Sequence, residues 1–401
     1  MKKPIYLLWL EDVQPSSLST VPSLVELARR GIDLHLTPLP LVEKGQCYYQ
    51  AMTGMGPGKF GRFDAVQPEM YCAQVLSGIP EGGRLLPDIL RKHKLAVTSL
   101  EITATDALDI LTSAAEAPDL ALVRFTAVLA PNELDALVQH CLAIIGSEAH
   151  LFVLTGVSSP SPRTLVNVND FLADEGLLEV RQPRSRATII WSETLAYGLG
   201  TGQIWVNLRG REPQGIVNSG REYQEVCNVL IRELRTNWLD SVTYEPVVEQ
   251  VFKKDEIYTG EYLFKAPDLT VVYRPGYAAS PNATNLDLDG ESILSAQQTD
   301  HVAVASDPGQ SQAPYARLIA GGPSLVSDFS GQAELIDIMP SIMYLLGLPI
   351  PQHVDGQVIE AIFTQSYRLQ TPIRRSEVDE GLLSDEEEGL IVNRLRDLGY
   401  L

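Results

Sequence analysis

The stretch HLFVLTGVSSPSPRTLVNVNDFLADEGLL, residues 150–178, contains the strand around which we expect the chain to be organised. Its opening apolar run ends at Gly156 and a Ser/Pro cluster, which is typical of a buried strand that enters a loop. In an open α/β sheet, chemistry takes place just outside the carboxyl ends of the strands. We therefore expect Leu154, Thr155 and Gly156 to lie at a reaction site, although none of them binds metal strongly or moves a proton near neutral pH.

The residues before this strand alternate between strand and helix patterns. An apolar run at Ile5–Leu10 precedes a helix pattern at Val21–Arg30 and a second strand at Ile32–Leu36, which together predict a βαβ unit and a parallel sheet. A core strand at Leu120–Thr126 and an amphipathic helix at Pro131–Ile145 continue the alternation. The first 155 or so residues are therefore interpreted as half of a doubly wound α/β domain.

The second half of the chain has a different pattern. Residues 158–300 contain frequent Pro and Gly, short strands and one strong helix at Glu222–Thr236, which predicts an inserted cap. A strand resumes at Ala313–Ile319, and a helix follows at Ile336–Leu346. We predict a first core part at 1–157, a cap at 158–300, a second core part at 301–368, and an acidic linker with a C-terminal helix at 369–401.

The composition limits the classes of partner. The 401 residues include 31 Lys and Arg against 51 Asp and Glu, a net charge of −20. Such a surface repels nucleic acid and anionic membranes, so we expect neither as a partner. A partner protein or a small molecule remains, and the oligomeric state is open.

The cysteines indicate a reducing compartment. Cys47, Cys72, Cys141 and Cys227 form no close pair, no CxxC motif and no zinc-type spacing with histidine. The N-terminal apolar run is too short for a signal peptide, and no stretch approaches the roughly 18 apolar residues of a membrane span. We therefore predict a cytoplasmic protein with reduced, structural thiols.

A glycine-rich turn, TGMGPGKFG at residues 53–61, lacks the spacing of a phosphate-binding P-loop. Its glycines, at positions 54, 56, 58 and 61, are interpreted as sites of positive φ and close packing.

Six stretches resemble the type I phosphodiesterase/nucleotide pyrophosphatase group of the alkaline phosphatase superfamily. They are NVNDFLADEGLL (167–178), LAYGLGTGQIWVNLRGREPQGIV (195–217), KKDEIYTGEY (253–262), APDLTVVY (266–273), LIDIMPSIMYLLGLPIPQHVDGQVI (335–359) and RLRDLGYL (394–401). The resemblance implies an alkaline-phosphatase-like three-layer sandwich, with a central, mainly parallel sheet and an inserted cap. It also implies two metal ions, usually zinc, held by Asp and His, and a Thr or Ser nucleophile.

The first catalytic positions of the family are replaced in this chain. The first metal-binding Asp falls on Leu10-Glu11-Asp12, where a carboxylate remains. The nucleophile falls near Glu43-Lys44-Gly45, with no Ser or Thr beside it, and the histidine of the glycine-rich turn is Phe60.

The remaining metal ligands are also missing. The family's Asp-x-x-x-His pair falls near Leu129 and Glu133, and its Ser-Asp-His-Gly signature falls on residues 153–156, Val-Leu-Thr-Gly. The last metal-binding histidine falls near Gln312. Two metal ions need about six such ligands to offset their dehydration. We therefore predict no cofactor, and the first hypothesis is a pseudoenzyme with a binding or scaffold role.

Two alternatives remain. A rearranged site could use Asp300, His301 and Asp307 with Glu11 or Asp12 and would suit magnesium or calcium better than zinc. The chain would then be a divergent phosphodiesterase or phosphate ester hydrolase.

Alternatively, Lys44 or Cys47 could act as the nucleophile of a metal-free group transfer in the same cleft. If the cleft is open, its predicted walls are Glu11, Asp12, Lys44, Thr155 and Gln312.

Overall fold

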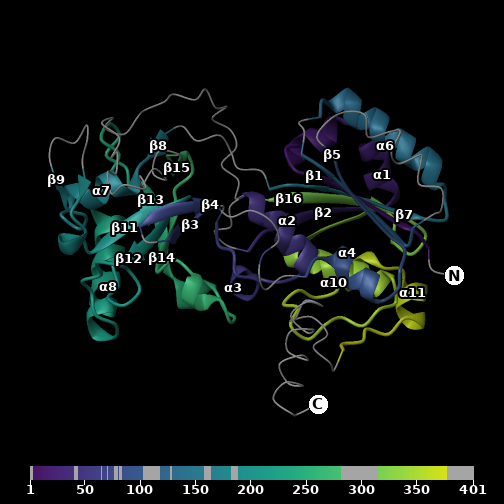
Figure 1. Ribbon diagram of the computed structural model, residues 1–401. Helices are drawn as coiled ribbons and strands as arrows, with labels where there is room; N and C mark the ends of the chain where they lie inside the picture. Colours follow the sequence, from purple (N-terminus) through teal and green to yellow (C-terminus); the bar gives the residue numbers. More distant parts are fainter. Residues whose placement is uncertain are drawn as a thin grey trace, which may run out of the picture.

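Two lobes make up the computed structural model (Figure 1). One lobe contains a seven-stranded sheet between helices, and the other is built around a four-stranded sheet. The structure describes residues 3–39, 44–64, 66–69, 71–75, 80, 84–102, 118–126, 129–157, 164–181, 188–280 and 315–376.

The large sheet has the strand order β17-β2-β16-β7-β1-β6-β5. All its strands run in the same direction except β16, which is antiparallel to both of its neighbours. The strands are β1 (Ile5–Leu10), β2 (Ile32–Thr37), β5 (Val97–Ile102), β6 (Leu120–Phe125), β7 (His150–Thr155), β16 (Ala316–Gly321) and β17 (Phe329–Glu334). The predicted α/β class with a mainly parallel central sheet is therefore confirmed.

Helices cover both faces of this sheet. One face packs against α1 (Pro22–Arg30) and α6 (Pro131–Ile145). The other packs against α2 (Lys44–Thr53), α4 (Leu86–Lys92) and α10 (Ile338–Leu345). Figure 1 shows these two helical layers on opposite sides of the sheet. Because both faces are covered, the central strands are apolar throughout, and all six residues of β7 are buried.

The second lobe is organised by an antiparallel sheet with the order β11-β12-β14-β13. Its strands are β11 (Ala196–Leu199), β12 (Gln203–Val206), β13 (Val248–Lys253) and β14 (Leu269–Tyr273). The helices α7 (Val168–Asp174) and α8 (Arg221–Thr236) pack on it, and α8 contributes Cys227, Leu230 and Leu234 to its core. The prediction of a helix at Glu222–Thr236 is confirmed within one residue. All these elements lie inside the predicted cap range, whose boundaries stay a prediction.

One part of the first predicted core segment belongs to the other lobe. The strands β3 (Val66–Glu69) and β4 (Cys72–Val75) form a hairpin near the cap. Between them, the Tyr71 ring stacks on Trp191 with 3.7 Å between centroids, and its hydroxyl donates to Asn207 Oδ1 at 2.7 Å. Tyr71 is buried in the cap's apolar cluster. Tyr71, which lies within the first predicted core part, therefore packs against the second lobe, a contact that the local pattern did not indicate.

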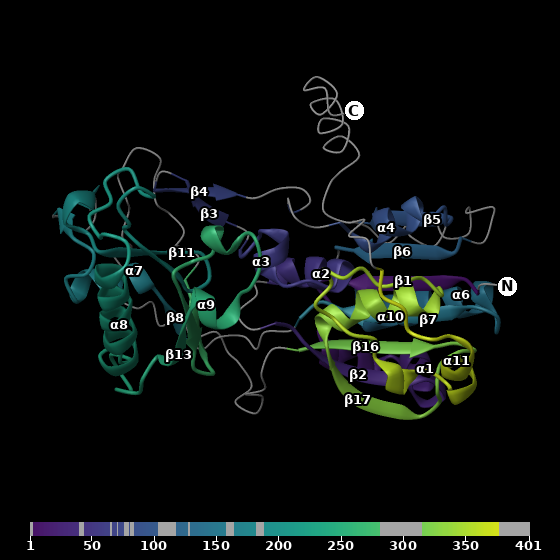
Figure 2. The same ribbon diagram turned by 90° about the horizontal axis from the view of Figure 1, so that it is seen from below.

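The glycine-rich turn lies between the two lobes, where it forms the short helix α3 (Pro57–Phe60) (Figure 2). A Cβ atom on Gly58 would lie 2.3 Å from the carbonyl oxygen of Thr259, and the Gly58 carbonyl accepts the Tyr262 amide proton at 2.9 Å. On the other side, Lys59 Nζ donates to Asp355 Oδ1 at 2.5 Å. Gly61 has a φ of +80°. The interpretation of these glycines as sites of close packing and positive φ is confirmed.

The second core part returns to the large sheet and then covers it. Here β16 begins at Ala316, three residues after the predicted start, and a 3₁₀ turn at Leu335–Asp337 leads into α10. A further short helix, α11 (Gln365–Gln370), follows. Among the residues placed by the structure, no helix has the length and apolarity needed to cross a bilayer. The predicted C-terminal helix lies outside the described residues.

Candidate functional site

The carboxyl ends of β1, β6 and β7 meet at one edge of the large sheet. Leu10 pairs with Phe125 on one side and with Thr155 on the other. The Gly156 amide then donates to the Leu10 carbonyl at 2.8 Å, and a Cβ atom on Gly156 would lie 2.4 Å from the Glu11 carbonyl oxygen. The structure therefore brings together two of the predicted cleft residues, Glu11 and Thr155.

The Glu11 carboxylate is paired with an arginine. Arg124 of β6 donates from Nε to Glu11 Oε2 at 2.8 Å, and its Nη2 lies 2.6 Å from the same oxygen. Only 17% of the Glu11 side chain and 21% of the Arg124 side chain are exposed. A third group, the exposed Glu101, lies 3.8 Å from Arg124 Nη1. A partly buried cation therefore neutralises the carboxylate that the family resemblance assigns to metal binding.

An aromatic residue of α2 covers this ion pair. The Arg124 guanidinium lies 4.5 Å from the ring centroid of Tyr48, which is a cation–π distance. Tyr48 meets Trp9 edge-on at 5.3 Å, and burial raises the pKa of Tyr48 to about 12 despite the nearby Arg124 charge. Helix α2 begins where the family resemblance places the nucleophile. In this chain it contributes the neutral Tyr48 ring that covers Arg124.

Sequence reasoning missed Arg124. It stands in LALVRF, where it is the one charged residue in an otherwise apolar core strand. A charge within a buried strand requires a partner, so this signal was present in the sequence. What was absent was the register that places Arg124 beside Glu11.

Thr155 uses its hydroxyl to hold the neighbouring strand. It is fully buried, and its Oγ1 accepts the Arg317 backbone amide proton at 2.9 Å. The Arg317 side chain donates from Nε and Nη2 to the two Asp33 oxygens at 2.8 and 2.6 Å. The only hydroxyl in the Val-Leu-Thr-Gly stretch therefore contributes to the packing of β16 against β7.

The two candidate nucleophiles lie at the start of α2. Lys44 is its first residue, and its side chain is not among those described. Cys47 is fully buried, in the same apolar cluster as Trp9 and Met52. A thiol needs access to an electrophile to react, and full burial denies Cys47 that access.

Of the other predicted metal and cleft residues, only Asp12 is among the described residues. Asp12 follows Glu11 and is half-buried. The four residues Asp300, His301, Asp307 and Gln312 lie outside the described residues.

Several residues that stand where the family resemblance places metal ligands or the turn histidine pack in the core or cap a helix. Phe60 is fully buried and packs near Tyr49. Glu133 accepts the Ala130 amide proton at 2.9 Å and so caps the start of α6. Val153 and Leu154 are fully buried within β7. Among the residues that the structure describes, no group of three or more His, Cys, Asp or Glu is arranged to hold a metal ion. The donor set for two metal ions is therefore not provided by this described part of the chain.

Comparison with known proteins identifies the fold through structure alone. The sequence matches no protein-family profile, and no curated protein is significantly similar to it. Murine ectonucleotide pyrophosphatase/phosphodiesterase 5 superposes with a TM-score of 0.53 and 12% identity, over 90% of this chain and 100% of that chain. The human protein gives 0.52 and 12%, over 92% and 99%. An inactive variant of the murine protein in complex with AMP gives 0.51 and 12%, over 87% and 96%.

Proposed function

We propose that this chain, which has the alkaline-phosphatase-like fold of the nucleotide pyrophosphatase/phosphodiesterases, is a catalytically degenerate member that binds a partner and lacks two-metal hydrolysis. The observation that carries the proposal is the Glu11–Arg124 pair at the carboxyl edge of the sheet. Two-metal hydrolysis uses paired cations to neutralise phosphate and to ionise the nucleophile. In this chain the Glu11 carboxylate is already paired with the guanidinium of Arg124.

Electrostatics explains why this pair opposes metal binding at Glu11. Two positive charges a few ångströms apart repel strongly at the low effective dielectric of a partly buried site. A divalent ion that binds Glu11 therefore has to displace Arg124, whose guanidinium would lose its carboxylate partner. The partly buried arginine would then keep only the exposed Glu101, 3.8 Å from Nη1, as a weak counter-charge, so the exchange is unfavourable.

The apolar residues at the replaced positions support the same proposal. Val153 and Leu154 contribute to the core, where family members would carry metal ligands. Unpaired carboxylates at these buried positions would destabilise the metal-free fold, and apolar side chains stabilise it. The chain therefore keeps its fold without metal ions.

The decisive experiment is a metal and activity analysis of the full chain. The protein is exposed in turn to zinc, manganese and magnesium, dialysed, and analysed for bound metal by mass spectrometry. Each sample is then assayed with bis(p-nitrophenyl) phosphate, and AMP binding is measured by calorimetry. We expect less than stoichiometric metal and no hydrolysis above the protein-free rate. Stoichiometric metal together with turnover would overturn the proposal.

Three variants separate the alternatives if turnover is found. Loss of metal and turnover in His301→Ala would assign them to the rearranged site of Asp300, His301 and Asp307. Metal-independent turnover that is lost in Cys47→Ala, or in a Lys44→Ala variant, would assign it to group transfer. Arg124→Gln serves as a further variant, because it frees Glu11 and should increase the metal content only if Arg124 is what excludes the ion.

A further inference from the structure

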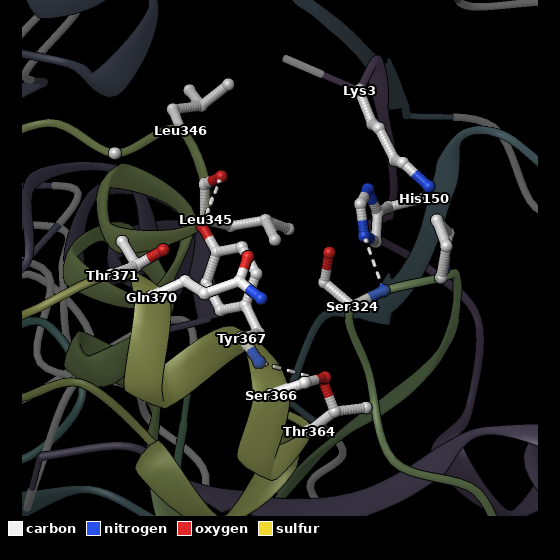
Figure 3. A pocket seen from close by; sticks show the side chains of 12 residues that line it. Lys3, His150, Ser324, Leu345, Leu346, Thr364, Ser366, Tyr367, Gln370 and Thr371 are labelled. Carbon is white, nitrogen blue, oxygen red and sulfur yellow. Dashed lines mark hydrogen bonds between the residues drawn. The ribbon is translucent and has the colours of Figure 1, made fainter. Parts of the chain in front are cut away.

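A pocket of about 530 Å³ opens at the amino end of the large sheet, opposite the edge that carries Glu11. His150, the first residue of β7, forms one wall, and Ser324 follows β16. The opposite wall consists of Leu346, at the end of α10, and Ser366 of α11 (Figure 3). This volume lies within the range of small-molecule sites in proteins, about 300–1,000 Å³.

The wall around His150 is built by a close backbone approach. His150 is buried, and its Nε2 accepts the Ser324 amide proton at 3.2 Å, as Figure 3 shows. A Cβ atom on Gly322 would lie 2.4 Å from His150 Cδ2, so only glycine allows the loop to pass over the ring. Burial, and then the Lys3 charge, lower the pKa of His150 to about 4, so the ring is neutral at neutral pH. Within the described part of the chain, its other nitrogen, Nδ1, has no hydrogen-bond partner.

The wall formed by α11 is held in place by its tyrosine. Tyr367 Oη lies 2.8 Å from the Leu345 carbonyl oxygen, at the end of α10. The adjacent Tyr344 hydroxyl donates to the Thr371 carbonyl at 2.7 Å. These bonds join α10 to the middle of α11 and to the residue that follows it. The pocket is therefore formed before a ligand arrives, which lowers the entropy cost of binding.

The chemistry of the lining differs from that of the chain as a whole. Although the chain has a net charge of −20, none of the described residues that line the pocket is Asp or Glu, whereas Lys3 is among them. The Lys3 ammonium lies 3.3 Å from the exposed Glu148, which leaves it further N–H donors. Hydroxyls of Ser324 and Ser366 and the amide of Gln370 supply both donors and acceptors.

We propose that this pocket binds a small anion that carries several hydroxyl groups, with its charged end at Lys3 and its hydroxyls on the Ser and Gln side chains. The apolar Leu345 and Leu346 offer a surface for the carbon–hydrogen face of such a ligand. Among the lining residues that the structure describes, a cation finds no carboxylate, and a purely apolar ligand would leave the polar side chains without partners. A sugar phosphate and a sugar acid share the required chemistry.

Calorimetry of the full chain with four probes tests the proposal. The probes are ribose 5-phosphate, gluconate, neutral ribose and inorganic phosphate, each at up to about 10 mM because so small a ligand binds in the micromolar to millimolar range. We expect ribose 5-phosphate or gluconate to bind, and ribose and phosphate to bind at least about fivefold more weakly. The anion that binds more tightly identifies the charged group. No binding of either anion, or equally tight binding of ribose or of bare phosphate, would overturn the proposal.

Variants localise the binding to this pocket. Ser366→Trp places a large side chain at the exposed mouth and should weaken binding more than tenfold, whereas Lys3→Gln should weaken it about fivefold. The matched controls are Arg368→Trp, an exposed α11 position outside the lining, and Lys253→Gln in the other lobe, and both should bind as the wild type does. Gln370→Trp is a second blocking variant if Ser366→Trp fails to fold. Binding that persists in a folded blocking variant, or that falls equally in the controls, would refute the site.

Discussion

Arg124 directs two nitrogens, Nε and Nη2, at a single carboxylate oxygen of Glu11, at 2.8 and 2.6 Å. The two residues are 113 positions apart in the sequence and meet because β1 and β6 are parallel neighbours. The pair occupies the end of the first strand, where the family resemblance places a metal-binding carboxylate. The stability of this ion pair therefore bears directly on whether Glu11 can bind a metal ion.

Replacement of Arg124 by methionine should destabilise the protein. The change keeps much of the side chain's volume but leaves Glu11 without a counter-charge and Tyr48 without its cation. Removing one partner of a fully buried pair costs about 3–5 kcal/mol, and the partial exposure of this pair reduces the expected loss to about 2 kcal/mol. The free energy of unfolding in urea measures it.

The control is Arg91→Met, which removes an exposed pair with Asp88 on α4 and should cost less than about 0.5 kcal/mol. The double variant Glu11→Gln/Arg124→Met should recover part of the loss, because no unpaired charge remains. If Arg124→Met costs no more than Arg91→Met, the edge does not depend on this ion pair.

Acidification should destabilise the protein through His150. Burial lowers its folded-state pKa to about 4, below the unfolded value of about 6.5. Between these pH values the unfolded state binds more protons than the folded state. The stability that the protein has with neutral His150 is therefore complete above about pH 6.5 and is lost as the pH falls toward 4. The difference corresponds to about 3 kcal/mol, measured as the free energy of unfolding across this range.

The variant His150→Gln should flatten that part of the pH profile. His93→Gln, which changes a half-buried residue at the end of α4, should leave the profile as it is. An equally steep profile in His150→Gln would show that other groups cause the loss.

Replacement of Asp268 by asparagine should destabilise the cap. The carboxylate is fully buried and accepts hydrogen bonds from Arg211, Lys254, Tyr223 and the Val206 amide, at 2.6 to 3.0 Å. Burial raises its pKa, but the hydrogen bonds and charge of Arg211 outweigh this and lower it overall. Its stabilisation is therefore complete above the unfolded pKa of about 3.9 and is lost as the pH falls through the lower folded value.

We expect Asp268→Asn to cost about 3 kcal/mol at neutral pH, since Arg211 and Lys254 lose their shared counter-charge. Limited proteolysis of the cap and urea unfolding both report the loss. The exposed Asp255→Asn on α9 removes the same charge from the same lobe and should change the free energy of unfolding by less than about 0.5 kcal/mol. Equal losses in the two variants would contradict the role assigned to Asp268.

Addition of a methyl group at Gly58 should loosen the contact between the lobes. The new Cβ would lie 2.3 Å from the Thr259 carbonyl oxygen, and backbone cannot move aside as a flexible side chain can. We expect Gly58→Ala to cost about 2 kcal/mol and to increase hydrogen exchange at the Tyr262 amide, which donates to the Gly58 carbonyl. In Gly176→Asn, where the new Cβ meets nothing within 4 Å and asparagine tolerates the left-handed φ of +68°, that exchange should stay unchanged. Unchanged exchange in Gly58→Ala would mean that the contact has no such role.

The sequence alone predicts the fold class because a buried strand can be recognised from its own run of apolar residues. The runs at Ile5–Leu10, Leu120–Phe125 and His150–Thr155 are apolar on both faces, as parallel strands covered by two helical layers must be. The same logic places Glu11 and Thr155 at one edge, since both follow or end such strands. The amphipathic period likewise predicts α6 and α8.

Only the tertiary structure decides which distant groups meet. The pairing of Glu11 with Arg124 depends on strand order and register, and the insertion of Tyr71 beside Trp191 depends on how the lobes pack. Local sequence records whether a residue is buried, because solvation acts on each side chain separately. It does not record a residue's partner, because hydrogen bonds and ion pairs act over a few ångströms between segments that folding alone brings together.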